Sequence, residues 1–175
     1  MHAKISRTPL GASSLHAEGE AFDLGWTGAR GEEAPPDVSG LPSVDTALYL
    51  IHTVKFRACQ LFHLFDEEAF FSHFYAFYEN PIDVASEHQL WYVHYLLIIA
   101  FGKAFISRGI PTTSSRLPGC EFFVRAMALL PDTTYLCLDE ILSSEILTCV
   151  ALYLQSLDFR GAAHCYVRPP HQSGL

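Results

Sequence analysis

Charged residues are scarce in this sequence of 175 residues, in which Asp, Glu, Lys and Arg together make up 17%. An ordinary globular protein carries about 25%. Basic residues are the rarest, with 11 Lys and Arg against 19 Asp and Glu, so the formal net charge is −8. Nucleic-acid affinity rests largely on cations that neutralise phosphates. We therefore do not expect this chain to bind DNA directly.

Cysteine clusters are also missing. The five cysteines are Cys59, Cys120, Cys137, Cys149 and Cys165, and no two of them form a CxxC pair. An odd and dispersed count is typical of a reduced intracellular protein. It also excludes a zinc cluster, which needs closely spaced thiolates. The expectation is that this chain holds no metal and no cofactor.

Targeting segments and catalytic motifs are the third group of absences. The N-terminus lacks the apolar core of a signal peptide. The longest apolar run, Leu90–Phe101, is interrupted by His94 and is shorter than the roughly 20 residues of a membrane span. No Gly-x-Ser-x-Gly, P-loop, GxGxxG or HExxH pattern is present. We therefore expect no membrane association, assign no catalytic residue and do not expect an enzyme.

Apolar residues, by contrast, make up 50% of the chain and recur at helical spacing. Ser43 is a good N-cap for a first helix. Asp66 opens a second helix, with Glu67 and Glu68 in a first turn where the helix dipole favours anions. Asn80-Pro81 ends that helix. No segment of the chain predicts a strand.

Four more helices are predicted after Asn80-Pro81. Ser86, with Gln89 three residues later as a capping box, opens a helix that runs to about Ser107. The next helix is Cys120–Leu130, which Pro131 stops. The last two start at acidic caps.

Asp139 opens the fifth helix, which ends near Ser156, and Asp158 opens the sixth, which Arg168-Pro169-Pro170 cuts short. The fifth is apolar on most sides and should be buried on most sides. The sequence therefore predicts an all-α, multi-helix antiparallel bundle. We expect it to be a truncated part of a larger helical domain.

The segment Leu117–Val167 carries a family resemblance. It contains LDEILSSEILTC and ALYLQSLDFRGAAHCYV, a long helix followed by a D-x-R-x-AA-x-x-Y pattern. This order resembles the middle homology region of fungal transcription factors, the large helical domain downstream of a Zn₂Cys₆ DNA-binding cluster. A looser match extends back to Leu41. The resemblance implies a non-catalytic regulatory domain in the nucleus, with DNA and zinc bound only by full-length relatives.

Domain organisation follows from composition and from this resemblance. Residues 1–40 lack periodicity and are predicted to be disordered; Glu18–Trp26 within them is a candidate coactivator-binding segment, although an ordinary linker is favoured. Residues 41–168 form a partial helical regulatory domain. Residues 169–175 form an irregular tail unlike the family, which indicates a truncated or mis-spliced product. Uncovered apolar helices then predict protein partners or self-association, and the family implies a small-molecule effector.

Three polar groups are candidates for chemistry. Cys59 and His63 would share a helix face and could begin a metal site, but a buried thiol beside an imidazole is favoured. Asp66-Glu67-Glu68 could suggest a magnesium-dependent isoprenoid enzyme, but acids that complement the helix dipole explain them better. His94 is a candidate pH switch, with a hydrogen-bonded core histidine favoured.

Aromatic residues leave a second function open. The sequence gathers Phe70, Phe71, Phe74, Tyr75, Phe77 and Tyr78 on one helix and Trp91, Tyr92 and Tyr95 on the next. A ligand pocket or dimer surface is an alternative to core packing, which is favoured. The rival function is a small all-helical enzyme or apolar-ligand carrier, which a pocket with convergent polar groups would support. A third possible function is that of a helical interaction module unrelated to transcription.

Overall fold

The computed structural model describes residues 36–107, 118–131, 136 and 139–156, and every regular element in this part is an α-helix. The helices are α2 (Val44–Arg57), α3 (Glu67–Glu79), α4 (Pro81–Glu87), α5 (Gln89–Ser107), α6 (Cys120–Leu129) and α8 (Glu140–Ser156). The all-α prediction is therefore confirmed. The segment Glu18–Trp26, the helix expected after Asp158 and the tail 169–175 lie outside the described residues.

Three of the predicted helix starts are confirmed by side-chain caps. The Ser43 side chain accepts from the backbone N–H of Thr46. The Asp66 side chain accepts a hydrogen bond of 2.8 Å from the backbone N–H of the third residue after it, and the Asp139 side chain accepts an equivalent hydrogen bond of 3.0 Å. Each cap satisfies a backbone donor that the helix itself leaves unpaired.

The short helix α4 corrects the prediction for this region. Asn80 does end α3, but Pro81 is the first residue of a new helix, a position where its missing N–H costs nothing. Ser86 lies inside α4, and its hydroxyl donates to the carbonyl of Ile82 at 2.7 Å. It therefore does not cap α5, which begins at Gln89, and the predicted capping box is wrong.

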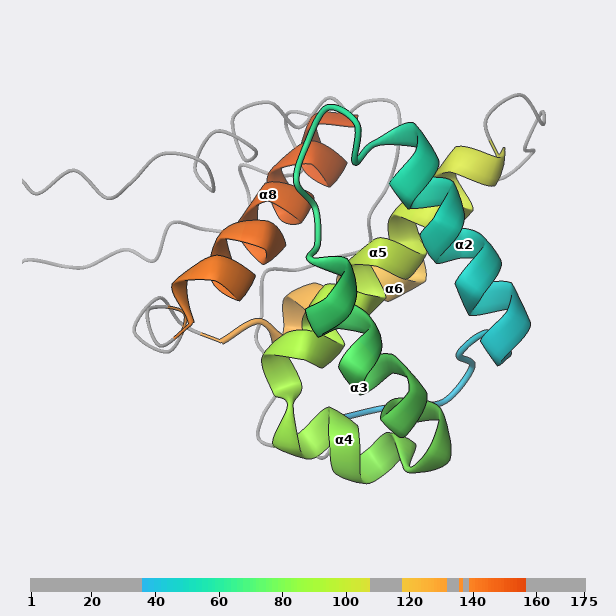
Figure 1. Cartoon of the computed structure of the whole chain (residues 1–175), viewed down its shortest axis with the longest axis vertical. Coiled ribbons are helices and arrows are strands. Elements are labelled where there is room, and N and C mark those ends of the chain that lie inside the picture. Colours follow the sequence, from blue (N-terminus) through green and yellow to red (C-terminus); the bar gives the residue numbers. More distant parts are fainter. Residues whose placement is uncertain (1–35, 108–117, 132–135, 137–138, 157–175) are drawn as a thin grey trace, which may run out of the picture.

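Helix α5 is the central element, and α2, α4, α6 and α8 all pack against it (Figure 1). Every residue from Trp91 to Gly102 is buried. A helix that is apolar all round is stable only when it is covered all round. The four neighbouring helices therefore share α5 as a common packing partner.

Length and hydropathy alone would let α5 cross a membrane, because an 18-residue window in it has a mean hydropathy of 1.5. The run Leu90–Phe101 is itself shorter than a membrane span, but the helix that contains it extends to Ser107. In the structure, 67% of that window is buried by the rest of the fold. Packing within the bundle accounts for its apolar character.

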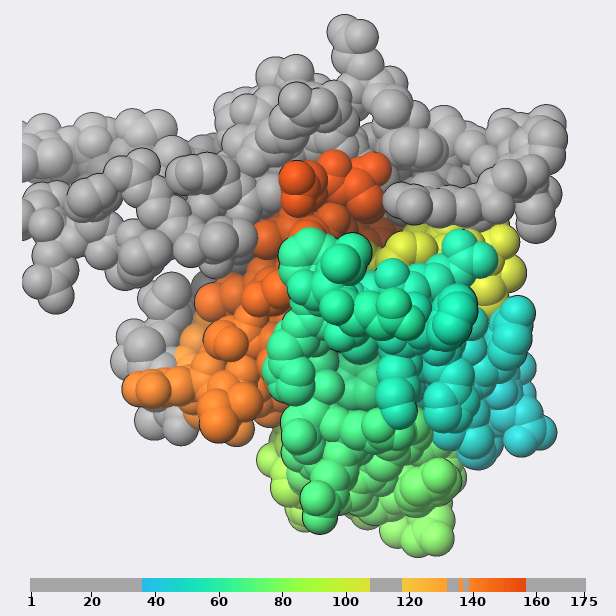
Figure 2. Space-filling view, turned by 45° about the horizontal axis from the view of Figure 1, so that its top comes forward, coloured from blue at the N-terminus to red at the C-terminus, as the bar shows by residue number. Residues whose placement is uncertain are grey.

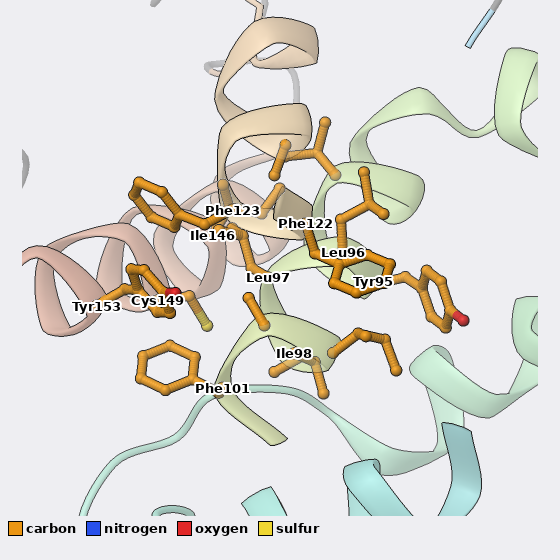
Figure 3. Close-up of a cluster of buried hydrophobic side chains, with 14 of the residues drawn as sticks. Tyr95, Leu96, Leu97, Ile98, Phe101, Phe122, Phe123, Ile146, Cys149 and Tyr153 are labelled. Atoms are coloured by element: carbon orange, nitrogen blue, oxygen red, sulfur yellow. The ribbon is translucent and has the colours of Figure 1, made fainter. Parts of the chain in front are cut away.

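Buried side chains of α5, α6 and α8 meet in one cluster of the core (Figure 3). Phe123 of α6 stacks on Tyr153 of α8 with ring centroids 4.2 Å apart, and Phe101 of α5 meets the same ring edge-on at 5.4 Å. Helix α6 runs antiparallel to α5, because the Gln89 side chain at the start of α5 donates to the carbonyl of Leu129 at the end of α6. Helix α8 runs in the same direction as α5, because Glu145 near its start faces His94 and Tyr153 near its end meets Phe101.

Aromatic side chains fill the space between α3 and α5. Phe70, Phe74 and Phe77 are buried, as are Trp91, Tyr92 and Tyr95 of α5. The Tyr78 hydroxyl donates to the carbonyl of Pro42 and lies 2.8 Å from the Tyr95 hydroxyl. Core packing is thus confirmed for these six rings, whereas Tyr75 of the predicted aromatic set is 58% exposed.

Residues 36–40 are held against the bundle by two side chains. The Tyr92 hydroxyl donates to the carbonyl of Asp37 at 2.6 Å. Arg125 donates to the carbonyl of Ser39 at 2.8 Å and pairs with the Asp37 carboxylate at 3.3 Å. The packed part of the chain therefore begins before Leu41, within the segment that composition assigns to disorder.

We expect Tyr153→Phe to raise the free energy of unfolding by about 1 kcal/mol, because an unpaired buried hydroxyl costs about that much. Within the described residues, the Tyr153 hydroxyl is buried without a hydrogen-bond partner. Tyr92→Phe is the matched control, since its hydroxyl is bonded and its removal should be destabilising. Urea unfolding measures both, and a destabilised Tyr153→Phe variant would contradict the prediction.

Candidate functional site

Polar side chains converge where the N-termini of α3 and α8 approach the first turns of α5. They line a pocket of about 280 Å³. Three carboxylates belong to it, those of Asp66, Asp139 and Glu145, and no Lys or Arg does. The imidazoles of His73 and His94 are the other ionisable groups of the lining.

Glu145 is the buried carboxylate of this pocket, with only 6% of its side chain exposed. Its Oε1 lies 3.0 Å from Nε2 of His63, and its Oε2 lies 3.8 Å from Nδ1 of His94. The carboxylate therefore joins three segments: the connection between α2 and α3 (residues 58–66), α5 and its own helix α8. Figure 2 shows this connection lying beside α8 at the surface.

Burial raises the pKa of Glu145 above its ordinary value, and the charge of His63 opposes that change. His63 itself is 70% exposed. Within the described part of the chain, Oε1 of Glu145 is buried without a hydrogen bond of good geometry, and Nε2 of His63 lies 3.0 Å from it, a contact that is ionic only when His63 is protonated. The carboxylate is thus only partly compensated, a costly state for a buried charge.

His94 is neutral at pH 7, because burial lowers its pKa to about 4. Its Nε2 lies 2.7 Å from the carbonyl oxygen of Leu64, so this nitrogen carries the hydrogen and donates it. The prediction of a hydrogen-bonded core histidine is confirmed. Nδ1 is then a proton acceptor that faces the Glu145 carboxyl group.

The other two carboxylates of the pocket also serve as helix caps. Oδ1 of Asp66 caps the N-terminus of α3, and Oδ1 of Asp139 caps the N-terminus of α8. The interpretation of the Asp66-Glu67-Glu68 run as helix-start acids is confirmed, and Glu67 pairs with Lys55 of α2. No group of three His, Cys, Asp or Glu residues in the described ranges is placed to hold a metal ion.

Cys59 and His63 do not share a helix face, which corrects the premise of the predicted metal pair. Helix α2 ends at Arg57, because Ala58 is its C-cap, and both residues lie in the connection that follows. His63 approaches Glu145 instead. Cys59 is half-buried, and desolvation raises the pKa of its thiol.

Glu145 is the site residue that the sequence reasoning missed. A signal was present, because Leu142, Glu145, Cys149 and Leu152 follow one another at the three- and four-residue spacing of a single helix face. An acid within an apolar stripe must be buried with a partner or must serve a site. His63 and His94 could not be paired with it from the sequence, because they lie on other segments.

A second surface of interest lies on α2 and the connection after it. Large apolar side chains are exposed there, among them Tyr49, Phe56, Leu61 and Phe62. Phe56 is 75% exposed and Leu61 is 79% exposed. Exposed apolar side chains of this size are common where proteins meet. It is the described surface that best fits the expected association with a partner.

The pocket can bind a polar group within an aromatic enclosure, because Phe70 and Trp91 line it beside the carboxylates. It also holds a buried acid, Glu145, whose Oε2 lies 3.8 Å from Nδ1 of the neutral His94 imidazole. Comparisons with family models, with curated proteins and with solved structures find no match to this chain.

Proposed function

We propose that this chain is a regulatory helical domain of the fungal transcription-factor class that its sequence resembles, acting in the nucleus and carrying out no catalysis. The observation that carries the proposal is the pocket in which Glu145 joins α8, α5 and the α2–α3 connection. A ligand in such a position touches several helices at once. DNA and zinc would be bound by the full-length relatives only.

The physical basis is differential affinity. A ligand or partner regulates a domain only if it binds one packing of the helices better than another. The Glu145 contacts provide an element that can respond, since they hold a loop segment to two helices through a partly compensated charge. The exposed apolar side chains Phe56 and Leu61 support a protein partner or self-association on a different surface.

The test is a reporter assay in a fungal host with the full chain fused to a heterologous DNA-binding domain. We expect nuclear localisation of the fluorescently tagged chain and a change in reporter expression of about fivefold relative to the DNA-binding domain alone, a typical regulatory coupling. Glu145→Gln should alter this response. Glu87→Gln, the same change at an exposed site outside the pocket, should not.

A folded fusion that reaches the nucleus and leaves the reporter unchanged would overturn the proposal. The rival function, a carrier of small ligands, is favoured by the same pocket, because its walls combine aromatic and polar groups as ligand sites do. A chain that binds a small molecule tightly but has no effect on the reporter would fit the carrier and not the regulator.

A further inference from the structure

We propose that a groove on the outer face of α2 binds the acidic, aromatic segment Glu18–Trp26 of the same chain. The groove has a volume of about 600 Å³ and is lined by α2 and by the end of α5, through Tyr49, His52, Thr53, Phe56, Arg57 and Ile106. The segment itself lies outside the described residues. This inference goes beyond the proposed function, because it concerns a contact within the chain and not an effect on transcription.

The apolar side chains of the groove are the first argument. Tyr49 and Phe56 are both exposed, and they lie seven residues apart, which places them two turns along one face of α2. Ile106 of α5 is exposed beside them. Helix α2 lies at the outside of the bundle (Figure 1). A segment with apolar side chains gains free energy by covering this surface, because apolar area is then removed from water.

Arg57 is the second and independent argument. The other basic side chains of the described residues pair with acids: Lys55 with Glu67, Lys103 with Glu121 and Arg125 with Asp37. Arg57 lines the groove and has no acidic partner within the described part of the chain. A cation without a partner beside exposed aromatic rings is complementary to an acidic segment that carries aromatic side chains.

The segment Glu18–Trp26 supplies that charge. Its sequence, EGEAFDLGW, contains three acidic residues and no Lys or Arg. A carboxylate and a guanidinium form a charge-assisted hydrogen bond, which is stronger than a neutral one. The segment therefore matches Arg57 in charge while its aromatic residues match the apolar wall of the groove.

The spacing of the apolar residues in the segment fits the groove. Phe22, Leu24 and Trp26 are two residues apart, so an extended segment would present all three on one face. Phe22 and Trp26 would then be about 13 Å apart at the usual rise of a strand. Tyr49 and Phe56 are about 10 Å apart along the axis of α2. Each aromatic ring of the segment can therefore lie against one ring of the groove.

The tether between the segment and the bundle is long enough. Pro36 is the first described residue, and the chain from Trp26 to Pro36 spans at most about 36 Å. The path from Pro36 through Ser43 and along α2 places Tyr49 at most about 34 Å from Pro36. A short tether gives an effective concentration of about 1 mM. A contact with a Kd of about 0.1 mM would then be formed in about nine-tenths of the molecules.

Trp26 itself is the probe for the experiment. The chain contains two tryptophans, Trp26 and Trp91, so the difference in fluorescence between the parent chain and Trp26→Phe isolates the emission of Trp26. Acrylamide quenching of that emission measures how far Trp26 is shielded from solvent. We expect quenching in the native full chain to be several-fold weaker than in urea, because only about a tenth of the molecules would expose Trp26.

Two variants of the groove test where the segment binds. Phe56→Ser should weaken the contact about tenfold, the effect of truncating a central aromatic residue, so that about half of the molecules expose Trp26. Arg57→Gln should weaken it about twofold to fivefold. Both side chains are exposed, so neither change should unfold the bundle. Ile82→Ser and Lys103→Gln are matched changes outside the groove and should leave the quenching of Trp26 unchanged.

Three results would overturn the inference. The first is a Trp26 that is quenched in the native chain as readily as in urea. The second is shielding that persists unchanged in Phe56→Ser, because the segment would then be covered by another surface. The third is shielding that disappears on dilution while light scattering shows dimers at high concentration, because the segment would then occupy the groove of a second copy.

Discussion

Acidification from pH 7 to pH 4 is expected to lower the free energy of unfolding by about 3 kcal/mol through His94 alone. Burial lowers the pKa of His94 to about 4 from its ordinary value of 6.5. Between these two values the unfolded chain binds a proton that the folded chain does not. The contribution of neutral His94 to the free energy of unfolding is therefore fully present above pH 6.5, and it is lost as the pH falls towards 4.

Urea unfolding between pH 7 and pH 4 measures this effect, and His94→Gln is the variant for comparison. The His94→Gln variant should not show the part of the acid-induced loss in free energy of unfolding that comes from His94, whatever its stability at pH 7. Glu145 acts in the opposite sense, because its raised pKa favours the protonated form in the folded chain. Glu145→Gln should therefore make the acid-induced loss steeper than in the parent. If the free energy of unfolding changed with pH in the same way in the parent and in His94→Gln, the assignment of this loss to His94 would be contradicted.

Gly119→Ala is expected to lower the free energy of unfolding by about 3 to 4 kcal/mol, from backbone strain and overpacking together. Gly119 has a φ of +92° at the start of α6, a conformation that L side chains rarely adopt. A Cβ atom there would lie 2.6 Å from the carbonyl oxygen of Ala100 in α5. Backbone cannot rotate away as a flexible side chain can, so α6 would have to move.

Gly40→Ala separates the two contributions. Gly40 also has a positive φ, +65°, but a Cβ atom there would have nothing within 4 Å. Only the backbone cost of about 1 kcal/mol should remain. Thermal or urea unfolding of both variants gives the difference, which measures the close approach of α6 to α5. Equal losses in the two variants would show that this approach is not tight.

Helix starts were predictable here because capping is a local property. Ser43, Asp66 and Asp139 each accept a hydrogen bond from a backbone N–H three residues later, which a sequence pattern can indicate. Helix α4 was missed because Pro81 was interpreted as the end of one helix, whereas proline is equally suited to begin the next. The choice between these roles depends on packing against α3 and α5, which no local pattern records.

The pocket was less accessible to sequence reasoning than the fold. Asp66 and His94 were considered separately, each with a structural role, and those roles are correct. Their meeting with Glu145 depends on how α8 lies against α5 and on the path of the connection after α2. Such contacts join residues far apart along the chain. Helical periodicity assigns a side chain to a face and does not say which other helix covers that face.

The central position of α5 has a consequence for synthesis on the ribosome. Helix α2 packs against α5, yet α2 ends at Arg57 and α5 ends at Ser107, so the partner emerges 50 residues later. At elongation rates of about 5–20 residues per second, the delay is roughly 3–10 s. During that interval the nascent chain exposes the apolar face of α2, a state that chaperones recognise. The α5 segment is therefore the point at which co-translational folding of this bundle can begin.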